Sequence, residues 1–403
     1  MSEKASVSVA VSGIRLGVAQ AGVKSADKDD LLVMALAPGT QTAAVFTRNA
    51  FRAAPVVLAE QHLRANQGHP THLIINTGNA NAGTGEPGLA AANQCCNALA
   101  ELTASAASAV LPFSTGVIGE PLPADLICAA LPAALEALQE DQWERAARAI
   151  LTTDTRPKLR SVEVELDGQT CRVTGMAKGA GMICPDMATM LAFVATDARL
   201  SPALLQATLR DAVAASFNRI TVDGDTSTND AVTLSSTGGS GIEVKAGTPQ
   251  AEQFAAAVTG VMIELAQDIV RDGEGASKFV EIRVSGGEST EACDRVGRTI
   301  AHSPLVKTAL FASDPNWGRI LAAIGRAGLS DLNTDDVSIH LNGVLIAERG
   351  ARALSYTEAQ GQAAMAAEDL VIEVALNRGG AQAVIWTTDL SYDYVKINAE
   401  YRT

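Results

Sequence analysis

MAKGAGMICPDMATML, residues Met176–Leu191, is the stretch of sequence in which a loop leads directly into a buried strand. Its glycines and Pro185 are typical of a loop, because both residue types interrupt regular structure. The apolar run Met190–Ala195 follows at once and is typical of a buried strand. Thr189 is therefore predicted to stand at the very start of that strand, with flexible backbone before it.

This position suits Thr189 for an attack on its own backbone. The Thr189 hydroxyl would attack the carbonyl of Ala188, and water would open the resulting ester, which leaves Thr189 as a new N-terminus. The liberated amine has an unperturbed pKa of about 7.7–8.0, so a useful fraction is neutral near pH 7 and accepts the hydroxyl proton. It would replace the histidine of other acyl-transfer enzymes. The competing interpretation is a purely structural threonine.

A second segment, Ser114–Gly119 (STGVIG), is interpreted as a glycine-containing turn after a predicted strand at Ala109–Leu111. Backbone N–H groups and a hydroxyl in such a turn can converge on an oxyanion, and one such donor typically stabilises a transition state by about 3 kcal/mol. An ordinary turn between a strand and a helix has the same pattern, so this segment alone leaves both interpretations open.

Composition excludes several classes of protein. Of the 403 residues, 47% are apolar and 4% aromatic, and 34 are glycine, as in a layered α/β enzyme. The formal net charge of −14 disfavours binding to nucleic acids and to anionic membranes. The N-terminus lacks the apolar stretch of a secretory signal, and no continuous apolar run reaches the length of a membrane span. A cytoplasmic protein is expected.

Cysteine and histidine spacing predicts no metal site. The six cysteines contain no Cys-x-x-Cys pair and are expected to be reduced thiols. His69 and His72 flank Pro70 and are interpreted as loop residues, because zinc sites normally recruit three or four spaced ligands.

Strands and helices alternate along the chain and predict an α/β (α+β) fold, with mixed sheets layered with helices. Short apolar runs next to turn residues predict strands at 32–36, 43–47, 73–75, 162–166, 171–173, 280–284, 337–341, 344–347, 370–375 and 383–387. Helical periodicity predicts helices at 89–102, 124–138, 142–151, 202–217, 252–270, 288–300 and 357–367. The length favours two domains, a catalytic domain over residues 1–280 and a C-terminal domain over 281–403 that completes the site.

Several motifs spread over nearly the whole chain share one resemblance. They are Thr189 with its flanks, Ser114–Gly119, Asn76–Gly85 (NTGNANAGTG), Ile220–Asn229 (ITVDGDTSTN), Asp314–Ile320 (DPNWGRI) and the closing Ile397–Thr403 (INAEYRT). Together they resemble the ornithine acetyltransferase family of arginine biosynthesis, whose members cleave themselves to expose a threonine nucleophile. The resemblance implies an N-terminal-nucleophile-like, self-processing fold.

The resemblance also implies the reaction and its residues. The acetyl group of N-acetylornithine would pass to Thr189 and then to glutamate, without a separate cofactor; whether acetyl-CoA also serves as donor stays open. Fragments 1–188 and 189–403 would stay together, and two such pairs would associate. Thr115 and Gly116 would stabilise the oxyanion, and the substrate would contact Thr153, Lys178, Thr189, Glu274, Asn398 and Thr403.

Charge supports two of these roles. Lys178 suits a substrate carboxylate, and Glu274 suits the side-chain ammonium of ornithine, although without the resemblance a solvated surface ion pair is the favoured interpretation of each residue. Cys184 and Asp186 depart from the family pattern. Cys184 is interpreted as a buried apolar thiol, and Asp186 as an extra carboxylate that alters either the cleavage rate or the charge felt by the substrate.

Two other functions fit the sequence. A threonine-nucleophile amidase or aminopeptidase would pass the same acyl intermediate to water. A metabolite-binding or scaffold protein would never cut itself.

Overall fold

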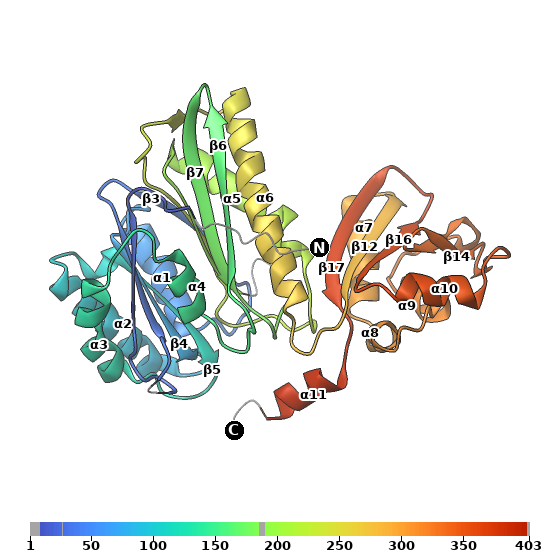
Figure 1. Cartoon of the computed structure of the whole chain (residues 1–403), viewed down its shortest axis with the longest axis horizontal. Coiled ribbons are helices and arrows are strands. Elements are labelled where there is room, and N and C mark those ends of the chain that lie inside the picture. Colours follow the sequence, from blue (N-terminus) through green and yellow to red (C-terminus); the bar gives the residue numbers. More distant parts are fainter. Residues whose placement is uncertain (1–8, 26, 185–189, 401–403) are drawn as a thin grey trace. The chain divides into compact units, whose positions relative to one another are not determined.

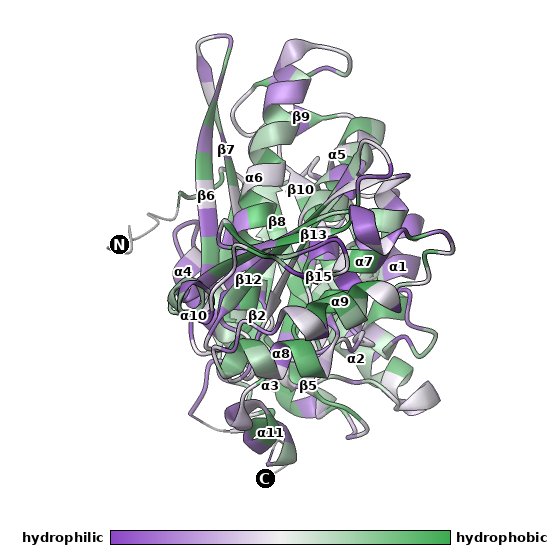
Figure 2. Cartoon of the chain, turned by 90° about the vertical axis from the view of Figure 1, so that its right-hand side faces the viewer, coloured by the Kyte–Doolittle hydropathy of each residue, from purple (hydrophilic) through white to green (hydrophobic). Residues whose placement is uncertain are grey.

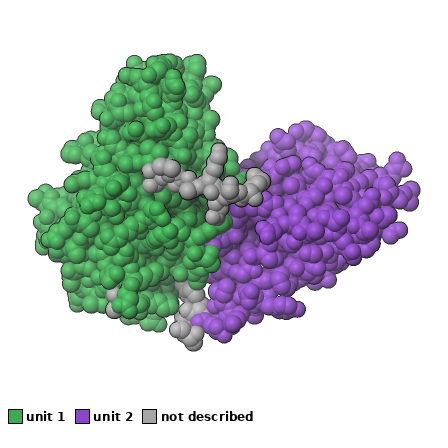
Figure 3. Space-filling model, in the orientation of Figure 1, with its two compact units in different colours: residues 1–218, 225–269 green, residues 219–224, 270–403 purple. Residues whose placement is uncertain are grey.

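The computed structural model describes residues 9–25, 27–184 and 190–400 (Figure 1). Its two compact units are residues 1–218 with 225–269, and residues 219–224 with 270–403 (Figure 3). The chain passes between them at Ile269 and Val270, ahead of the boundary expected near residue 280. The short segment 219–224 belongs to the second unit because Thr221 N donates to the carbonyl of Trp386 at 2.9 Å.

The first unit contains two large sheets. The four-stranded sheet has the order β1 (Ile14–Ala19), β2 (Leu31–Leu36), β4 (His72–Asn79) and β5 (Val110–Val117). The five-stranded sheet has the order β3 (Gln41–Phe46), β10 (Ala231–Ser236), β8 (Leu191–Thr196), β7 (Gln169–Lys178) and β6 (Lys158–Leu166). A small parallel pair joins β9 (Arg199–Leu200) to β11 (Glu243–Val244).

The two large sheets pack face to face. Every residue of β2, β8 and β10 is buried, which requires cover on both faces of each strand. One core cluster joins Leu16, Met34 and Phe113 of the four-stranded sheet to Met176 and Phe193 of the five-stranded sheet. The rings of Phe113 and Phe193 meet edge to face, with centroids 5.1 Å apart.

Helices cover the outer faces of this double layer (Figure 1). The four-stranded sheet packs against α1 (Ala54–Ala65), α2 (Gly85–Leu102) and α3 (Ala124–Glu136), while α4 (Trp143–Ala149) contributes Trp143 to the core between the sheets. The five-stranded sheet is covered by α5 (Pro202–Ala215) and α6 (Pro249–Arg271). The result is a helix–sheet–sheet–helix arrangement, and the prediction of mixed sheets layered with helices is confirmed.

By length and composition, helix α6 could cross a membrane. A single helix of this kind is weak evidence for a membrane span, because a core helix passes the same test. Its Val261 and Leu265 lie against Gly175 of β7, within 3.1–3.4 Å of where a Cβ would stand. This side of α6 therefore serves as cover for the sheet.

The second unit is built on one mixed sheet of six strands. Their order is β15 (Ala351–Arg352), β14 (Val344–Glu348), β13 (Ser338–Leu341), β16 (Asp369–Ala375), β12 (Phe279–Gly287) and β17 (Ala381–Thr388). Its helices are α7 (Thr290–Ala301), α8 (Pro304–Phe311), α9 (Trp317–Gly325), α10 (Glu358–Met365) and α11 (Tyr392–Ala399). Buried and more exposed residues alternate along β16, so one face of this sheet holds the core.

The hydropathy of a strand depends on whether it lies at the edge or in the centre of its sheet (Figure 2). Strand β6 carries polar and apolar residues in turn, and its outer half is only partly buried. The central strand β8 is apolar except for Thr196, at its end. Central strands are covered on both faces, whereas β6 is an edge strand.

Two strands extend further than the sequence predicted. The sequence predicted a strand only at 73–75 and a turn at Ser114–Gly119. In the structure, residues 76–79 continue β4 and residues 114–117 continue β5, and the two strands pair in parallel as far as Gly78 and Gly116. Pro112 does not end β5, because an edge strand tolerates a residue without an N–H group. The predicted oxyanion segment is therefore the end of a strand.

The contact between β1 and α3 offers a test of the packing. A Cβ at Gly17 would stand 1.9 Å from the carbonyl oxygen of Ala134, so Gly17→Ala should lower the free energy of unfolding by about 2–3 kcal/mol. Gly260→Ala, in α6 with no atom within 4 Å of its Cβ, should instead raise it by up to ~1 kcal/mol. Urea unfolding of both variants measures the difference, and equal stabilities would refute the close approach.

Candidate active site

The ends of β4 and β5 bring backbone into unusually close contact. Gly116 has φ +138°, and a Cβ there would lie 2.2 Å from the carbonyl carbon of Gly78. Only glycine fits this position. The pairing of the two strands is irregular at Gly78 and Asn79, so Thr115 and Gly116 lie where the regular ladder ends.

Buried amide side chains hold this irregular end. Asn76 Nδ2 donates to the carbonyl of Asn79 at 2.9 Å, and Ser114 Oγ donates to Asn76 Oδ1 at 2.6 Å. From the loop before β10, Asn229 Nδ2 donates to the carbonyls of Ala80 at 2.5 Å and Ser114 at 2.9 Å. Three motifs that were prominent in the sequence therefore meet around Thr115.

Lys178, at the end of β7, reaches the same place. Its Nζ donates to Thr115 Oγ1 at 3.2 Å, and both side chains are buried. Lys178 also pairs in register with Leu191, the first residue of β8. The structure thus brings together two residues that the sequence placed in one site, beside the strand that follows Thr189 in the chain.

Asp154 and Lys158 form a buried ion pair next to Lys178. Lys158 Nζ and the Gly179 N–H donate to Asp154 Oδ1 at 2.5 and 2.6 Å, and the Thr152 N–H donates to Oδ2 at 3.0 Å. Burial opposes ionisation of Asp154, but Lys178, Lys158 and these hydrogen bonds outweigh it and hold the pKa of Asp154 below its usual value. Asp154 is therefore a carboxylate that stabilises two ammonium groups.

Asp230 is a second buried acid that the sequence did not reveal. Burial raises the pKa of its carboxyl well above the usual value, while Ser227 and Lys178 act in the opposite direction. Its Oδ2 is one of four buried side-chain atoms in the described part of the chain without a hydrogen-bond partner. Asp230 directly follows the motif Ile220–Asn229, which was the available signal in the sequence.

The second unit holds two further predicted residues. Asn398 Nδ2, on α11, donates to Glu274 Oε2 at 2.7 Å. The turn that carries Glu274 lies close to the start of α11, because a Cβ at Gly275 would be 2.6 Å from Ser391 Oγ. Sequence positions more than a hundred residues apart are thus in direct contact, with Glu274 buried.

Buried Lys307 supports this part of the second unit. Its Nζ donates to Thr387 Oγ1 at 3.1 Å and to Thr388 Oγ1 at 3.2 Å. Burial lowers the pKa of Lys307 to about 7, although Asp389 and Asp223 raise it. Asp389 in turn accepts hydrogen bonds from Ser277 and Lys278, a few residues after Glu274.

Three predicted residues, Ala188, Thr189 and Thr403, lie outside the described residues. Thr153 is half-buried and directly precedes Asp154. Cys184 was expected to be buried but is only half-buried; its carbonyl accepts a hydrogen bond from Thr226 Oγ1 at 2.9 Å, so the contact comes from its backbone.

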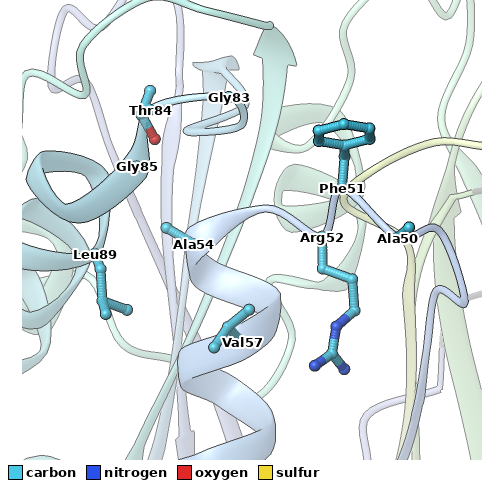
Figure 4. Close-up of a pocket in the computed structure, with 9 residues that line it drawn as sticks. All are labelled: Ala50, Phe51, Arg52, Ala54, Val57, Gly83, Thr84, Gly85 and Leu89. Atoms are coloured by element: carbon cyan, nitrogen blue, oxygen red, sulfur yellow. The ribbon is translucent and has the colours of Figure 1, made fainter.

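A surface pocket of about 320 Å³ opens where α1 and α2 begin (Figure 4). Phe51 and Arg52 approach it from one side, and Thr84 and Gly85 from the other. None of the predicted substrate residues lines it, so it is distinct from the predicted site. Over the described ranges, no group of three or more His, Cys, Asp or Glu side chains is arranged to hold a metal ion.

A hydroxyl, an ammonium group and glycine backbone gathered at strand ends suit an acyl-transfer enzyme, in which groups of these kinds stabilise the oxyanion of an attacked carbonyl. A family model described as the ArgJ family matches residues 15–403. The chain therefore belongs to the ArgJ family and is an acetyltransferase of arginine biosynthesis.

Two relatives that bear the family's name agree with this assignment over nearly the whole chain. The arginine biosynthesis bifunctional protein ArgJ of Pseudomonas syringae pv. tomato is 55% identical over 98% of this chain and 97% of its own. The protein of the same name from Methylococcus capsulatus is 57% identical over 98% and 96%. A solved ornithine acetyltransferase of Mycobacterium tuberculosis, complexed with ornithine, is 34% identical, with a TM-score of 0.42 over 46% of this chain and 97% of that one.

Removal of the Asp154 charge tests the buried cluster. Asp154→Asn leaves Lys158 without its carboxylate, so the free energy of unfolding at pH 7 should fall by about 3 kcal/mol or more. Since the folded pKa of Asp154 is depressed, this contribution is present above the unfolded pKa of about 4 and is lost as pH falls below it.

Urea unfolding from pH 7 down to pH 3 measures both effects. Asp29→Asn is the matched control, because Asp29 pairs with the half-exposed Arg145 at 2.9 Å and such pairs contribute less than about 1 kcal/mol. Equal losses in the two variants would contradict the buried character of the Asp154 pair.

Proposed function

We propose that the chain cleaves itself between Ala188 and Thr189 and then carries an acetyl group from N-acetylornithine to glutamate on Thr189. The observation that carries the proposal is the 3.2 Å hydrogen bond from Lys178 to Thr115, at the end of β7 beside the first residue of β8. It places a cation and a candidate oxyanion donor next to the strand that follows the scissile bond in sequence.

The transfer has two balanced halves. The Thr189 hydroxyl attacks the acetyl carbonyl, its proton passes to the free α-amine, and Thr115 with the Gly116 backbone stabilises the oxyanion. The intermediate then expels the ornithine amine, which takes that proton, and leaves an acetyl ester on Thr189. The amine of glutamate attacks this ester and regenerates the hydroxyl. No cofactor enters either half.

Charge supports the choice of substrates. Both amino acids bear an α-carboxylate, which suits the buried ammonium of Lys178. The carboxylate of Glu274, oriented by Asn398, suits the side-chain ammonium of ornithine. Thr153 and the terminal Thr403 complete the proposed contacts.

Three further points belong to the same proposal. Acetyl-CoA serves as a second donor for glutamate, in keeping with the word bifunctional in the names of the relatives. The two fragments remain together and associate as two pairs. The reaction takes place in the cytoplasm, since all six cysteines are free thiols.

Intact-mass measurement after incubation with N-acetylornithine tests this proposal. The parent should give two fragments, 1–188 and 189–403, with one acetyl group on the second, and glutamate should remove it as N-acetylglutamate. Thr189→Ala should remain one chain and lose transfer by at least ~10³-fold, since it lacks the nucleophile. Cys184→Ala should behave as the parent.

Three other outcomes of these measurements would change or refute the proposed reaction. Release of acetate instead of N-acetylglutamate would identify a hydrolase. A fully active, uncut parent, or acetyl transfer by Thr189→Ala at the parent's rate, would refute the mechanism. Formation of N-acetylglutamate from acetyl-CoA and glutamate, without ornithine, tests the second donor.

A further inference from the structure

The carbonyl of Ser114 belongs to an edge strand, β5. β5 is the outer strand of its sheet, so backbone groups on the side away from β4 have no neighbouring strand to pair with. Ser114 directly precedes Thr115, and the β4–β5 ladder becomes irregular just after Gly116. Thr115 and Gly116 are therefore the last residues that the regular ladder holds.

Asn229, from the loop before β10, provides a hydrogen-bond donor for the Ser114 carbonyl. Its Nδ2 uses both hydrogens, one on the Ser114 carbonyl at 2.9 Å and the other on the Ala80 carbonyl at 2.5 Å. The two acceptors lie beside the ends of β5 and β4. A single amide thus joins the residue after β4 to β5, the strand that carries both proposed oxyanion donors.

The Asn229 side chain is itself fixed. Its Oδ1 accepts from Thr228 Oγ1 at 2.7 Å, and its N–H donates to Ser227 Oγ at 3.1 Å. The amide orientation is unambiguous, because only the NH₂ group can face two carbonyl oxygens. Asn229 is 7% exposed, so water does not compete freely for these bonds.

The loop around Asn229 also holds the chain on both sides of the scissile bond. Thr226 Oγ1 donates to the carbonyl of Cys184 at 2.9 Å, and Ala231 N donates to the carbonyl of Met190 at 3.0 Å. Within six residues, this loop is bonded to the segment before Thr189, to the segment after it, and to the strand that carries Thr115. Asn229 occupies the middle of these contacts.

We propose that Asn229 is a positioning residue for acyl transfer, which fixes the Ser114–Gly116 backbone at the place where the oxyanion forms. This inference rests on the proposed function. Asn229 acts through the backbone of β5, so it affects the transition state and leaves substrate binding largely unchanged. Neither Asn76 nor Ser114 can replace it, because they bond to each other on the β4 side.

Steady-state acetyl transfer by Asn229→Ala and Asn229→Asp tests the proposal. Both variants should lower kcat by about ten- to a hundred-fold with KM changed less than about three-fold, because a misplaced oxyanion donor weakens only the transition state. Asn229→Asp keeps the shape but sets oxygens against two carbonyls, so its kcat should be no higher than that of Asn229→Ala.

Asn81→Ala is the matched control. Asn81 is completely buried, and its Nδ2 donates to the carbonyl of Gly88 at 2.9 Å, in the same region but away from β5. It should lose stability to urea to a similar extent while its kcat stays within about two-fold of the parent. If Asn81→Ala loses kcat as Asn229→Ala does, the effect is general loosening and the proposal fails.

Hydrogen exchange gives a readout that does not depend on the reaction. The peptide containing residues 114–117 should exchange at least ten-fold faster in Asn229→Ala than in the parent, and at the parent's rate in Asn81→Ala. Unchanged exchange in Asn229→Ala would overturn the positioning role. A parent without acetyl transfer would instead refute the proposed function, and the exchange result would still decide whether Asn229 holds the strand.

Discussion

The hydrogen bond between Lys178 and Thr115 joins the two sheets of the first unit at their ends. A buried ammonium is costly unless carboxylates and hydroxyl groups surround it, and Asp154 supplies the charge that makes this one possible. The face-to-face packing of the sheets brings these groups together, since β5 and β7 belong to different sheets. The site therefore exists only if both sheets form and pack.

The same constraint explains the concentration of polar side chains inside an apolar core. The side-chain amides of Asn76, Asn79 and Asn229 donate hydrogen bonds to backbone carbonyls at or just beyond the irregular strand ends. These carbonyls have no partner in the regular ladder. Glycine at position 116 allows the backbones of β4 and β5 to approach closely. The irregular strand ends are thus stabilised by hydrogen bonds from neutral side chains, beside the charged groups of Lys178 and Asp154.

Local sequence predicted the elements well and their partners poorly. The hairpin turns at Asp167–Gly168 and Asn342–Gly343 connect β6 to β7 and β13 to β14. Asp-Gly and Asn-Gly are local signals for such turns, because both turn residues need a positive φ. β2 and β3 flank Pro38–Gly39 but belong to different sheets, a choice made by distant partners. Helices α1, α8, α9 and α11 were missed. The last three have only eight or nine residues and few turns to show a period, whereas α1 has 12 residues, as many as the predicted α7, so length does not explain its omission.

By itself, the sequence determined that a segment rich in glycine precedes an apolar strand, β8, which begins at Leu191, and its motifs determined the family. These are properties of consecutive residues. Only the tertiary structure decided that Lys178 touches Thr115, that Asn398 touches Glu274, and that Asp154 and Asp230 are buried acids of opposite pKa shift. Such facts depend on strand pairing and burial between residues far apart in the chain, which no local pattern encodes.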